Sequence, residues 1–543
     1  MKILSKPYLF FAAVFSLLLL TYYKSLFSGY LLDDYLVLFG ERGMANKTLI
    51  ELFTTYQETF YRPVGHFLLW VSFQLFGNQP STFGYHAVNL LLFTAVICLF
   101  YKIVVQLSNN KELAFWTACL YAIHPVNGMQ INYITTNTVM SAVIMQQASM
   151  LLFITMIKEG KKISALSLGF FFLSLLSHEM SSFFLFYILI VASFNFKLNI
   201  KQALVLCLPY VAALVLFLLF RMCFHPLSSS NGTFPIAVYL GTYFVAGCEL
   251  IGWYISKLIF PVDIVFLWTS SLQYKIISLP QGFVLGVKQA SPLLICFSFL
   301  GCLAVLALVV YLLFFKWKQD IKSVALLIFM AGVVPVFYIS FVHYPYTAPL
   351  IEPHWFFFSS IGFYMLGATL ILWLKRRVDP KVWGVFIFLL LCGYLVSLNE
   401  NNSKWKDQET YCRYWLSLNK GNMTPFYGLG KALLEQGRYD EAIQYFNDGL
   451  SNSHYSNVMI LSDLGYAQFL KGDKKAAMES FNSAMAMDHR YSVLYYYLGK
   501  YHSAEEKWID AQNDYSMALK IFPSNKIYQD SLLSVRQHIA IHP

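Results

Sequence analysis

The chain has 543 residues, of which 57% are hydrophobic and 13% are charged, and its formal net charge is +10. Soluble globular domains carry about 25% charged residues, so this composition predicts an integral membrane protein. The basic residues lie in short clusters between apolar stretches, as in cytoplasmic membrane loops, which argues against a nucleic-acid-binding protein. The nine cysteines include no CxxC pair, which argues against a disulfide framework.

Eleven apolar stretches are candidate membrane spans, since a span needs about 20 residues. They are 7–27, 86–107, 112–128, 137–157, 163–178, 180–196, 202–222, 292–315, 322–342, 354–374 and 382–398. The stretch 237–260 is also apolar but carries Glu249 and Lys257. Counting it as a span would place two basic clusters outside, against the positive-inside tendency. We therefore expect it to be an interfacial or re-entrant helix.

Lys2 and Lys6 precede the first span, which favours a cytoplasmic N-terminus. With eleven spans, the segments 28–85, 223–291 and 343–353 then lie on the outer face, where we expect any chemistry. The first of them contains residues at the spacing of an interfacial helix. These are Leu49, Leu52, Phe53, Tyr56 and Phe60.

Asp33 and Asp34 lie just past the first span, after residues 28–32. Charged side chains at a membrane edge are costly and usually functional. Their neighbours Leu31, Leu32 and Tyr35 form an apolar setting that would raise a carboxylate pKa and make it a better general base. An acidic pair can also simply cap a helix, so both interpretations stay open.

Arg62, in the sequence Tyr61-Arg62-Pro63, can clamp a phosphate group through two parallel hydrogen bonds, or it can anchor the chain at the interface. Other polar residues lie at the expected outer ends of the spans, where each is either a site residue or a tolerated polar side chain. They are His86, Asn89, His124, His178, Glu179, Glu352 and His354.

These histidines and acids have no zinc-ligand spacing, although acids with histidines can hold Mg²⁺ or Mn²⁺. A divalent metal therefore stays open and no ligand is assigned. The sequence also lacks a Walker loop, a GxSxG elbow and an HExxH motif. Because nucleotide sugars are absent outside most cytoplasms, an outer-face sugar transferase would need an activated lipid-phosphate sugar.

Residues 423–526 contain an internal repeat with a period of 34 or 35. A glycine is followed at offsets of 12, 16 and 19 by a small residue, an aromatic residue and another small residue. The three sets are Gly430, Ala442, Phe446, Gly449; Gly465, Ala477, Phe481, Ala484; and Gly499, Ala511, Tyr515, Ala518. This is the tetratricopeptide pattern, in which paired helices pack closely at the small residues.

Several motifs occur together in one family. They are Asp33-Asp34, Tyr61-Arg62-Pro63, His86-x-x-Asn89, Ala122-Ile-His124-Pro125-Val126, Leu176-Ser-His178-Glu179, Lys257-Leu-Ile-Phe-Pro261 and the stretch from Glu352 to Gly362. With these motifs the chain resembles the polyprenyl-phosphate-sugar-dependent glycosyltransferases of the GT-C class. It looks most like the tetratricopeptide-containing protein O-mannosyltransferases and their bacterial relatives.

The resemblance implies an inverting transferase, in which an acid of the first outer loop deprotonates an acceptor hydroxyl that attacks C1 of the lipid-linked sugar. By position, Asp33 is the expected base, with Asp34 its catalytic neighbour or an acceptor contact. The expected donor-phosphate contacts are Arg62, Lys257 and His354. The expected outer-mouth and acceptor residues are His86, His124, His178, Glu179 and Glu352. The chain departs from the family pattern at His178, where relatives often have lysine, and at His354-Trp355, where they have an arginine-aromatic pair.

We therefore expect an all-α protein with a membrane glycosyltransferase domain of about eleven spans in residues 1–400. A linker (401–422), three tetratricopeptide repeats (423–526) and a C-terminal capping helix or tail (527–543) follow. Its partners would be a polyprenyl-phosphate-linked sugar, mannose-like, and a protein or glycan acceptor recruited by the repeats. The expected location is a bacterial inner membrane with periplasmic repeats, or the ER membrane with luminal repeats.

Two other functions remain open from the sequence. One is a polymerase or ligase of surface polysaccharide that uses a lipid-linked saccharide. The other is a membrane-anchored assembly scaffold without catalysis, in which the spans only anchor the repeats. A transporter is disfavoured, because its ionisable groups would lie within the spans rather than at their ends.

Overall fold

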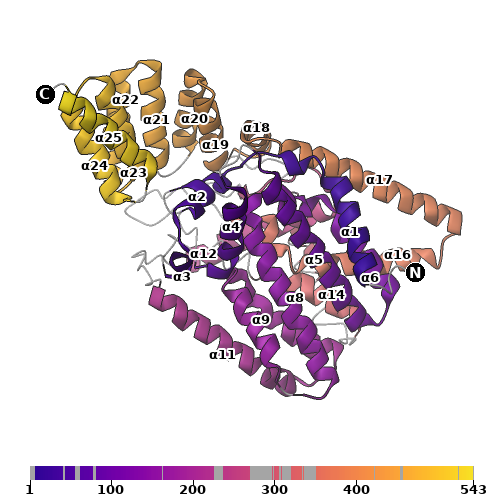
Figure 1. Ribbon diagram of the computed structural model, residues 1–543. Helices are drawn as coiled ribbons and strands as arrows, with labels where there is room; N and C mark the ends of the chain where they lie inside the picture. Colours follow the sequence, from indigo (N-terminus) through magenta and orange to yellow (C-terminus); the bar gives the residue numbers. More distant parts are fainter. Residues whose placement is uncertain are drawn as a thin grey trace. The chain divides into compact units, whose positions relative to one another are not determined.

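The computed structural model describes most of the chain and divides it into two compact units (Figure 1). The larger unit comprises Met1–Gly29 and Thr48–Lys406, and the repeat unit comprises Tyr30–Lys47 and Asp407–Pro543. The described residues are 7–40, 43–54, 61–77, 81–161, 163–224, 236–269, 320–332, 350–420, 422–452, 457–523 and 525–541, with single positions between 296 and 334.

The described part of the larger unit is almost entirely helical, which confirms the all-α prediction. Its α-helices are α1 (Pro7–Tyr22), α3 (Leu49–Thr54), α4 (Pro63–Phe76), α5 (Phe83–Ser108), α6 (Lys111–Ile123), α7 (Met129–Asn132), α8 (Asn137–Lys158), α9 (Ala165–Leu175), α10 (Phe184–Ile190), α11 (Ile200–Phe224), α12 (Ile236–Ile259), α14 (Ile321–Ala331), α16 (Ser360–Lys375) and α17 (Pro380–Lys404). Short 3-10 or π turns are η2 (Ser25–Phe27), η4 (Pro125–Gly128), η5 (Ile134–Thr136), η6 (Glu179–Phe183), η7 (Val191–Asn195) and η8 (Pro353–Phe356). Its two-residue strands β1 (Trp268–Thr269) and β2 (Leu350–Ile351) pair antiparallel.

The core of the larger unit is a set of packed helices around α5. Helix α5 packs against α6 and α8, and α16 packs against α6 and α14. Tyr121 of α6 lies at the centre, with its ring centroid 5.1 Å from that of Tyr364 and 5.6 Å from that of Phe357. Its hydroxyl donates to the Phe357 carbonyl at 2.7 Å, so the polar end of this buried side chain is satisfied.

Four segments of the described residues are long and apolar enough to cross a membrane by length and composition, where the sequence predicts eleven spans. They are Phe83–Ser108, Ile134–Lys158, Ile200–Cys223 and Pro380–Lys404. Other predicted spans coincide with shorter apolar helices, including α1, α9, α14 and α16. The expected span 292–315 and the second half of 322–342 lie mostly outside the described residues.

The predicted spans are shortened where a turn interrupts them. The expected span 112–128 is helical only to Ile123, because Pro125 opens the turn η4. The expected span 354–374 begins with the turn η8, and its α-helix starts at Ser360. Hydropathy alone does not detect these breaks, since each turn mixes apolar residues with a single polar side chain, Asn127 in η4 and His354 in η8.

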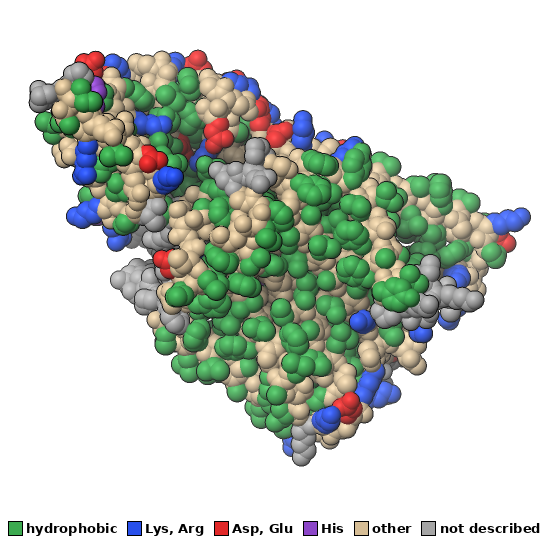
Figure 2. All heavy atoms as spheres, viewed as in Figure 1, with side chains coloured by type: hydrophobic (Ala, Val, Ile, Leu, Met, Phe, Trp, Pro, Cys, Tyr) green, Lys and Arg blue, Asp and Glu red, His purple; other side chains and the backbone are tan. Residues whose placement is uncertain are grey.

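Helices α11 and α17 direct many apolar side chains outward. Within the most apolar window, 22% of α11 and 11% of α17 are buried. Figure 2 shows a broad area of hydrophobic side chains over the larger unit, while charged side chains lie over the repeat unit and at the bottom and right edges of the larger unit. The exposed residues of α17 include Val382, Val385, Phe386, Phe388, Leu389, Leu395 and Val396.

The repeat unit contains consecutive helices that form antiparallel pairs (Figure 1). They are α18 (Gln408–Leu418), α19 (Thr424–Glu435), α20 (Tyr439–Asn452), α21 (Val458–Lys471), α22 (Lys474–Met487), α23 (Ser492–Ala504), α24 (Trp508–Ile521) and α25 (Lys526–Ile541). The linker expected at 401–422 is thus largely helical, because α17 extends to Lys404 and α18 begins at Gln408.

The glycines of the three repeats lie directly against the aromatic residue 16 positions later. A Cβ atom added to Gly430, Gly465 or Gly499 would lie 2.5, 2.7 or 2.6 Å from an aromatic ring carbon. Those rings belong to Phe446, Phe481 and Tyr515, each of which is buried. The predicted packing of small and aromatic residues is therefore confirmed.

The repeat unit also includes a segment from the N-terminal part of the chain. Residues 30–47 form α2 (Asp33–Phe39) and η3 (Met44–Asn46) and cluster with the repeat helices. The sequence placed these residues in the domain 1–400, because hydropathy and order along the chain carry no information on long-range packing. The acidic pair thus belongs structurally to the repeat unit.

Candidate functional site

The candidate site of the larger unit is built around an ion pair between Arg62 and Glu179. Pro63 begins α4, where its fixed φ suits the first helical turn, and Arg62 stands immediately before it. The Arg62 Nε donates to one Glu179 carboxylate oxygen at 2.8 Å, and a terminal nitrogen donates to the other at 2.5 Å. This two-point geometry fixes the orientation of both groups.

A close backbone contact brings α4 to the turn that carries Glu179. The Val64 N–H donates to the Leu176 carbonyl at 3.1 Å. A Cβ atom on Gly65 would lie 2.6 Å from the Ser177 carbonyl oxygen. Gly65 is therefore required for this approach, and nothing in the sequence pattern marks it as a site residue.

His178 caps the turn η6 and directs one ring nitrogen away from the backbone. Its Nδ1 accepts the Met180 N–H at 3.2 Å, so the neutral ring carries its proton on Nε2. The ring is 2% exposed, and its Nε2 has no hydrogen-bond partner among the described residues. His178 thus holds a buried donor that a bound group could satisfy.

His354 approaches His178 from the turn η8. The pairing of Ile351 with Trp268 precedes this turn and fixes its start. The ring centroids of His178 and His354 are 6.0 Å apart. The His354 Nδ1 lies 3.1 Å from a Glu352 carboxylate oxygen, but the atoms are not aligned for a hydrogen bond. The turn therefore brings a second buried imidazole and a carboxylate to the same place.

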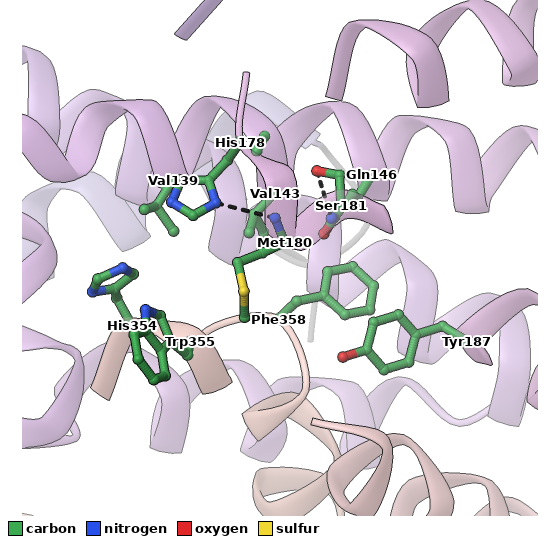
Figure 3. Close-up of a pocket in the computed structure, with 11 residues that line it drawn as sticks. Val139, Val143, Gln146, His178, Met180, Ser181, Tyr187, His354, Trp355 and Phe358 are labelled. Atoms are coloured by element: carbon green, nitrogen blue, oxygen red, sulfur yellow. Dashed lines mark hydrogen bonds between the residues drawn. The ribbon is translucent and has the colours of Figure 1, made fainter. Parts of the chain in front are cut away.

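The two histidines line a small cavity (Figure 3). The cavity has a volume of about 30 Å³. This is enough for one or two small polar groups but not for a sugar ring. Figure 3 shows the imidazole rings at one end, and Gln146, Ser181 and Tyr187 at the other. The remaining lining residues are Val139, Ala142, Val143, Met180, Trp355 and Phe358.

Gln146 supplies an acceptor to this cavity. Its side-chain N–H donates to the Ser181 hydroxyl at 2.9 Å, while its buried carbonyl oxygen has no hydrogen-bond partner among the described residues. The sequence analysis missed Gln146. The adjacent amides Gln146 and Gln147, inside an otherwise apolar stretch, are a signal that could have identified it.

The electrostatics keep both histidines neutral. Burial lowers the pKa of His178 to about 3, and the Arg62 charge acts in the same direction. Burial, with the neighbouring His178 and Arg62, also holds the pKa of His354 well below its ordinary value. Burial would raise the pKa of the Glu179 carboxyl, but Arg62 outweighs it and the pKa falls below its usual range. The site therefore presents neutral imidazoles beside an ionised Arg–Glu pair at neutral pH.

The structure thus brings together Arg62, His178, Glu179, Glu352 and His354, which the sequence predicted only as separate candidates. The guanidinium and the His178 Nε2–H are hydrogen-bond donors, and the cavity is too small for more than part of a ligand. A buried imidazole N–H beside an ionised guanidinium can hold an anionic oxygen. The assigned roles remain predictions.

His86 and His124, predicted at the outer mouth, both contact backbone groups. The two ring nitrogens of His86 lie 2.7 Å from the Ile131 carbonyl oxygen and 3.1 Å from that of Ser28. The His124 Nδ1 accepts from Val126, and its Nε2 lies 3.0 Å from the Leu258 carbonyl oxygen. These contacts give both rings a structural role.

Lys257, predicted at the donor phosphate, lies near the end of α12. Its side chain is largely buried, and its Nζ stands 5.8 Å from the centre of the Trp253 ring. No three His, Cys, Asp or Glu side chains of the described residues gather closely enough to hold a metal ion.

Asp33 and Asp34 differ in their surroundings. Asp34 is fully buried, and one of its carboxylate oxygens accepts the Leu31 N–H at 3.3 Å. Asp33 is exposed at the first position of α2. Asp33 is therefore the acid of the pair that the fold presents outward.

Residues 427–488 match the tetratricopeptide repeat family. The C-terminal repeats are tetratricopeptide repeats. The chain is also 34% identical over 95 residues to the protein O-mannosyl-transferase F38B6.6 of Caenorhabditis elegans, covering 17% of this chain and 14% of that protein.

Two further relatives are similar over a comparable length. The chloroplastic PsbB mRNA maturation factor Mbb1 of Chlamydomonas reinhardtii is 30% identical over 115 residues, covering 21% of this chain and 17% of that protein. The Hsp70-Hsp90 organising protein of Plasmodium falciparum is 32% identical over 108 residues, covering 20% and 42%. The chain thus spans less than half the length of these curated relatives.

Among solved structures, the first tetratricopeptide domain of RPAP3, bound to an HSP90 peptide, is 25% identical with a TM-score of 0.21, covering 22% of this chain and 96% of that one. The Cut9–Hcn1 hetero-tetramer of the APC/C is 12% identical with a TM-score of 0.24, covering 83% and 84%.

Proposed function

We propose that this tetratricopeptide repeat protein is a membrane glycosyltransferase that moves a mannose-like sugar from a polyprenyl-phosphate donor to a hydroxyl of an extracytoplasmic acceptor. The observation that carries the proposal is the Arg62–Glu179 ion pair directly beside His178, which lines one small cavity together with His354. These residues come from separate parts of the chain, and each lies where an apolar helix begins or is interrupted.

A membrane location is supported by the outward apolar faces of α11 and α17. Exposed apolar surfaces of this extent mark contact with lipid or a partner, and α17 carries no charged side chain from Val382 to Asn399. The proposed topology keeps about eleven spans, with a cytoplasmic N-terminus and the repeats outside.

The donor phosphate would bind at the Arg62 site. Glu179 holds the guanidinium in one orientation, and the His178 Nε2–H offers a neutral donor beside it. A cavity of about 30 Å³ suits a phosphate oxygen, so the sugar and the lipid tail would lie outside it. Neutral imidazoles can donate to the phosphate without releasing a proton to it.

Asp33 would act as the base, because it is the exposed acid of the pair. Its carboxylate would take the proton of the acceptor hydroxyl, the hydroxyl oxygen would attack C1 of the sugar with inversion, and the polyprenyl phosphate would leave. General-base catalysis of this kind contributes about 10²- to 10⁴-fold in rate. The repeats would hold the acceptor, since their concave surfaces bind peptides.

The test is transfer of labelled mannose from polyprenyl-phosphate mannose to extracytoplasmic protein acceptors by the full chain in lipid nanodiscs. We expect Asp33→Asn to lower kcat by at least about 10²-fold with membrane insertion unchanged. Full activity of Asp33→Asn would refute the assignment of the base. Products containing only elongated glycan would instead identify the polysaccharide polymerase or ligase.

A non-enzymatic scaffold is the second candidate, favoured by the 32% identity to the Hsp70-Hsp90 organising protein over 108 residues. In that case the repeats would bind a peptide partner and the larger unit would serve as an anchor. Cellular function would then tolerate Asp33→Asn and Arg62→Lys, but not deletion of 458–543.

A further inference from the structure

The segment that carries the acidic pair is built into the first helices of the repeat unit. Leu32 packs on the hydrophobic cluster that includes Cys412, Phe426 and Leu429. The Lys431 Nζ stands 5.1 Å from the centre of the Tyr35 ring. Contacts on both sides of Asp33 therefore join α2 to α18 and α19.

The side chain of Gln408 connects the segment that carries the acidic pair to the repeat helices through hydrogen bonds. The side-chain amide oxygen of Gln408 accepts the Leu32 N–H at 3.2 Å, and the amide N–H of the same side chain donates to the Gly428 carbonyl at 2.8 Å. Gln408 stands at the start of α18 and Gly428 within α19. The backbone just before Asp33 is thus held to two repeat helices by a single amide.

The space around this amide is closely filled. A Cβ atom on Gly428 would lie 2.8 Å from the Cys412 Sγ and 3.3 Å from a Leu32 methyl carbon. Leu32 also has a φ of +47°, a conformation that costs energy for a residue with a side chain. The surroundings must hold this backbone, and the hydrogen bond from Leu32 to Gln408 is part of that restraint.

This restraint on the Leu32 backbone affects which of the two carboxylates is buried and which is exposed. Asp34 is turned inward and bonds to the Leu31 N–H within its own turn. Asp33, the next residue after the strained Leu32, is exposed. A change in the Leu32 backbone would alter the orientation of the start of α2, and with it the orientation of both carboxylates.

We propose that Gln408 is a positioning residue for the acidic pair, so that the unit that binds the acceptor also carries and orients the acid that deprotonates it. This inference rests on the proposed function. Acceptor recruitment and proton removal then belong to one folded unit, and the repeats are required for the chemistry itself.

The test compares the full-length chain in nanodiscs with Gln408→Ala, Gln408→Glu and the control Gln468→Ala. Gln468 also makes a side-chain hydrogen bond within the repeat unit, accepting from Ser480 at 2.7 Å, but the segment 30–47 is not its partner there. Two quantities are measured: hydrogen exchange of the amides of residues 31–40, and kcat and KM for transfer.

We expect Gln408→Ala to speed exchange of these amides by about 10-fold or more and to lower kcat by a similar factor, with KM for the lipid donor unchanged. Gln408→Glu keeps the acceptor for the Leu32 N–H but loses the donor to the Gly428 carbonyl, so it should restore only part of the kcat. Gln468→Ala should change neither quantity.

Unchanged exchange in Gln408→Ala would overturn the positioning role, as would faster exchange with unchanged kcat. A lower kcat in Gln468→Ala equal to that in Gln408→Ala would also overturn it, because the effect would then be general destabilisation. Absence of transfer by the wild-type chain would overturn the proposed function instead, and is separately visible.

Discussion

Phe388 of α17 and Ile509 of α24 are exposed to nearly the same degree, 65% and 69%, yet their surroundings differ. Phe388 lies in a stretch without charged side chains from Val382 to Asn399, whereas Asp510 and Asp514 follow Ile509 within a few residues. Single exposed apolar residues are ordinary on soluble surfaces. Continuity of the apolar surface, rather than exposure itself, distinguishes the larger unit from the repeat unit.

The first prediction concerns the ion pairs of the two units and has the largest expected effect. Arg62→Ala would leave the Glu179 carboxylate, whose side chain is only 20% exposed, without its charged partner, which costs up to about 3–5 kcal/mol of unfolding free energy. In the repeat unit, Arg438 pairs with the carboxylates of Glu409 and Glu441, but its side chain is 39% exposed. Denaturant unfolding of each variant in detergent measures the difference.

Because solvent screens the ion pairs of Arg438, Arg438→Ala should lose much less unfolding free energy than Arg62→Ala. An equal loss in the two variants would contradict this comparison. The double variant Arg62→Ala/Glu179→Ala serves as the control, and should recover part of the loss by removing the unpaired charge.

The second prediction addresses the outward surfaces. Phe388→Arg should hinder membrane integration by about 2.5–3.5 kcal/mol, the cost of an arginine near the centre of a span. Ile509→Arg, at equal exposure, should leave integration unchanged. The fraction of protein that resists alkaline extraction from membranes provides the measurement, and equal behaviour of the two variants would remove the case for a lipid-facing α17.

The third prediction tests the close approach of α4 to the Glu179 turn. Gly65→Ala should destabilise the larger unit by about 1–3 kcal/mol, because the new methyl group meets the Ser177 carbonyl oxygen. Gly169→Ala, in α9 with no atom within 4 Å of the added Cβ, should be neutral or slightly stabilising. Thermal unfolding of both variants checks this, and a stable Gly65→Ala would show that the turn can shift.

The fourth prediction concerns acid. Below pH about 6.5 the imidazole of His178 takes up a proton in the unfolded chain but stays neutral in the folded one, down to its folded pKa of about 3. The unfolded state then binds more protons. The free energy of unfolding therefore decreases as the pH is lowered through this window, by up to about 1.4 kcal/mol per pH unit. Unfolding at pH 7.5, 6.0 and 5.0 measures the slope.

His178→Gln should reduce this slope by removing one titrating group, and the part of the slope that remains belongs to the other titrating groups of the chain. An unchanged slope in His178→Gln would mean that His178 is already protonated in the folded chain.

The repeats were predictable from the sequence, because their packing depends on short spacings. Gly465 and Phe481 lie 16 residues apart and meet within one helix pair, so the contact follows from helical geometry. The apolar helices were predictable for the same reason, since hydropathy is a local property. Their true ends were not, because η4 and η6 are formed by apolar and polar residues alike.

The candidate site was predictable only in part. Arg62, His178 and His354 could be singled out by residue type and by position at span ends, but the ion pair of Arg62 with Glu179 joins residues 117 positions apart. Gln146 and Gly65 were missed, because their importance arises from what packs against them. The hydrogen bond between Leu32 and Gln408 joins residues 376 positions apart, and no local sequence pattern predicts such a contact.

The discontinuity of the repeat unit bears on how the protein is made. Residues 30–47 leave the ribosome first, yet their packing partners begin at Asp407, about 360 residues later. At roughly 5–20 residues per second, the acidic segment waits about 20–70 s for α18 and α19. The docking of Leu32 is therefore among the last steps of biosynthesis, and a chain truncated before Gln408 would leave the acidic segment without its binding surface.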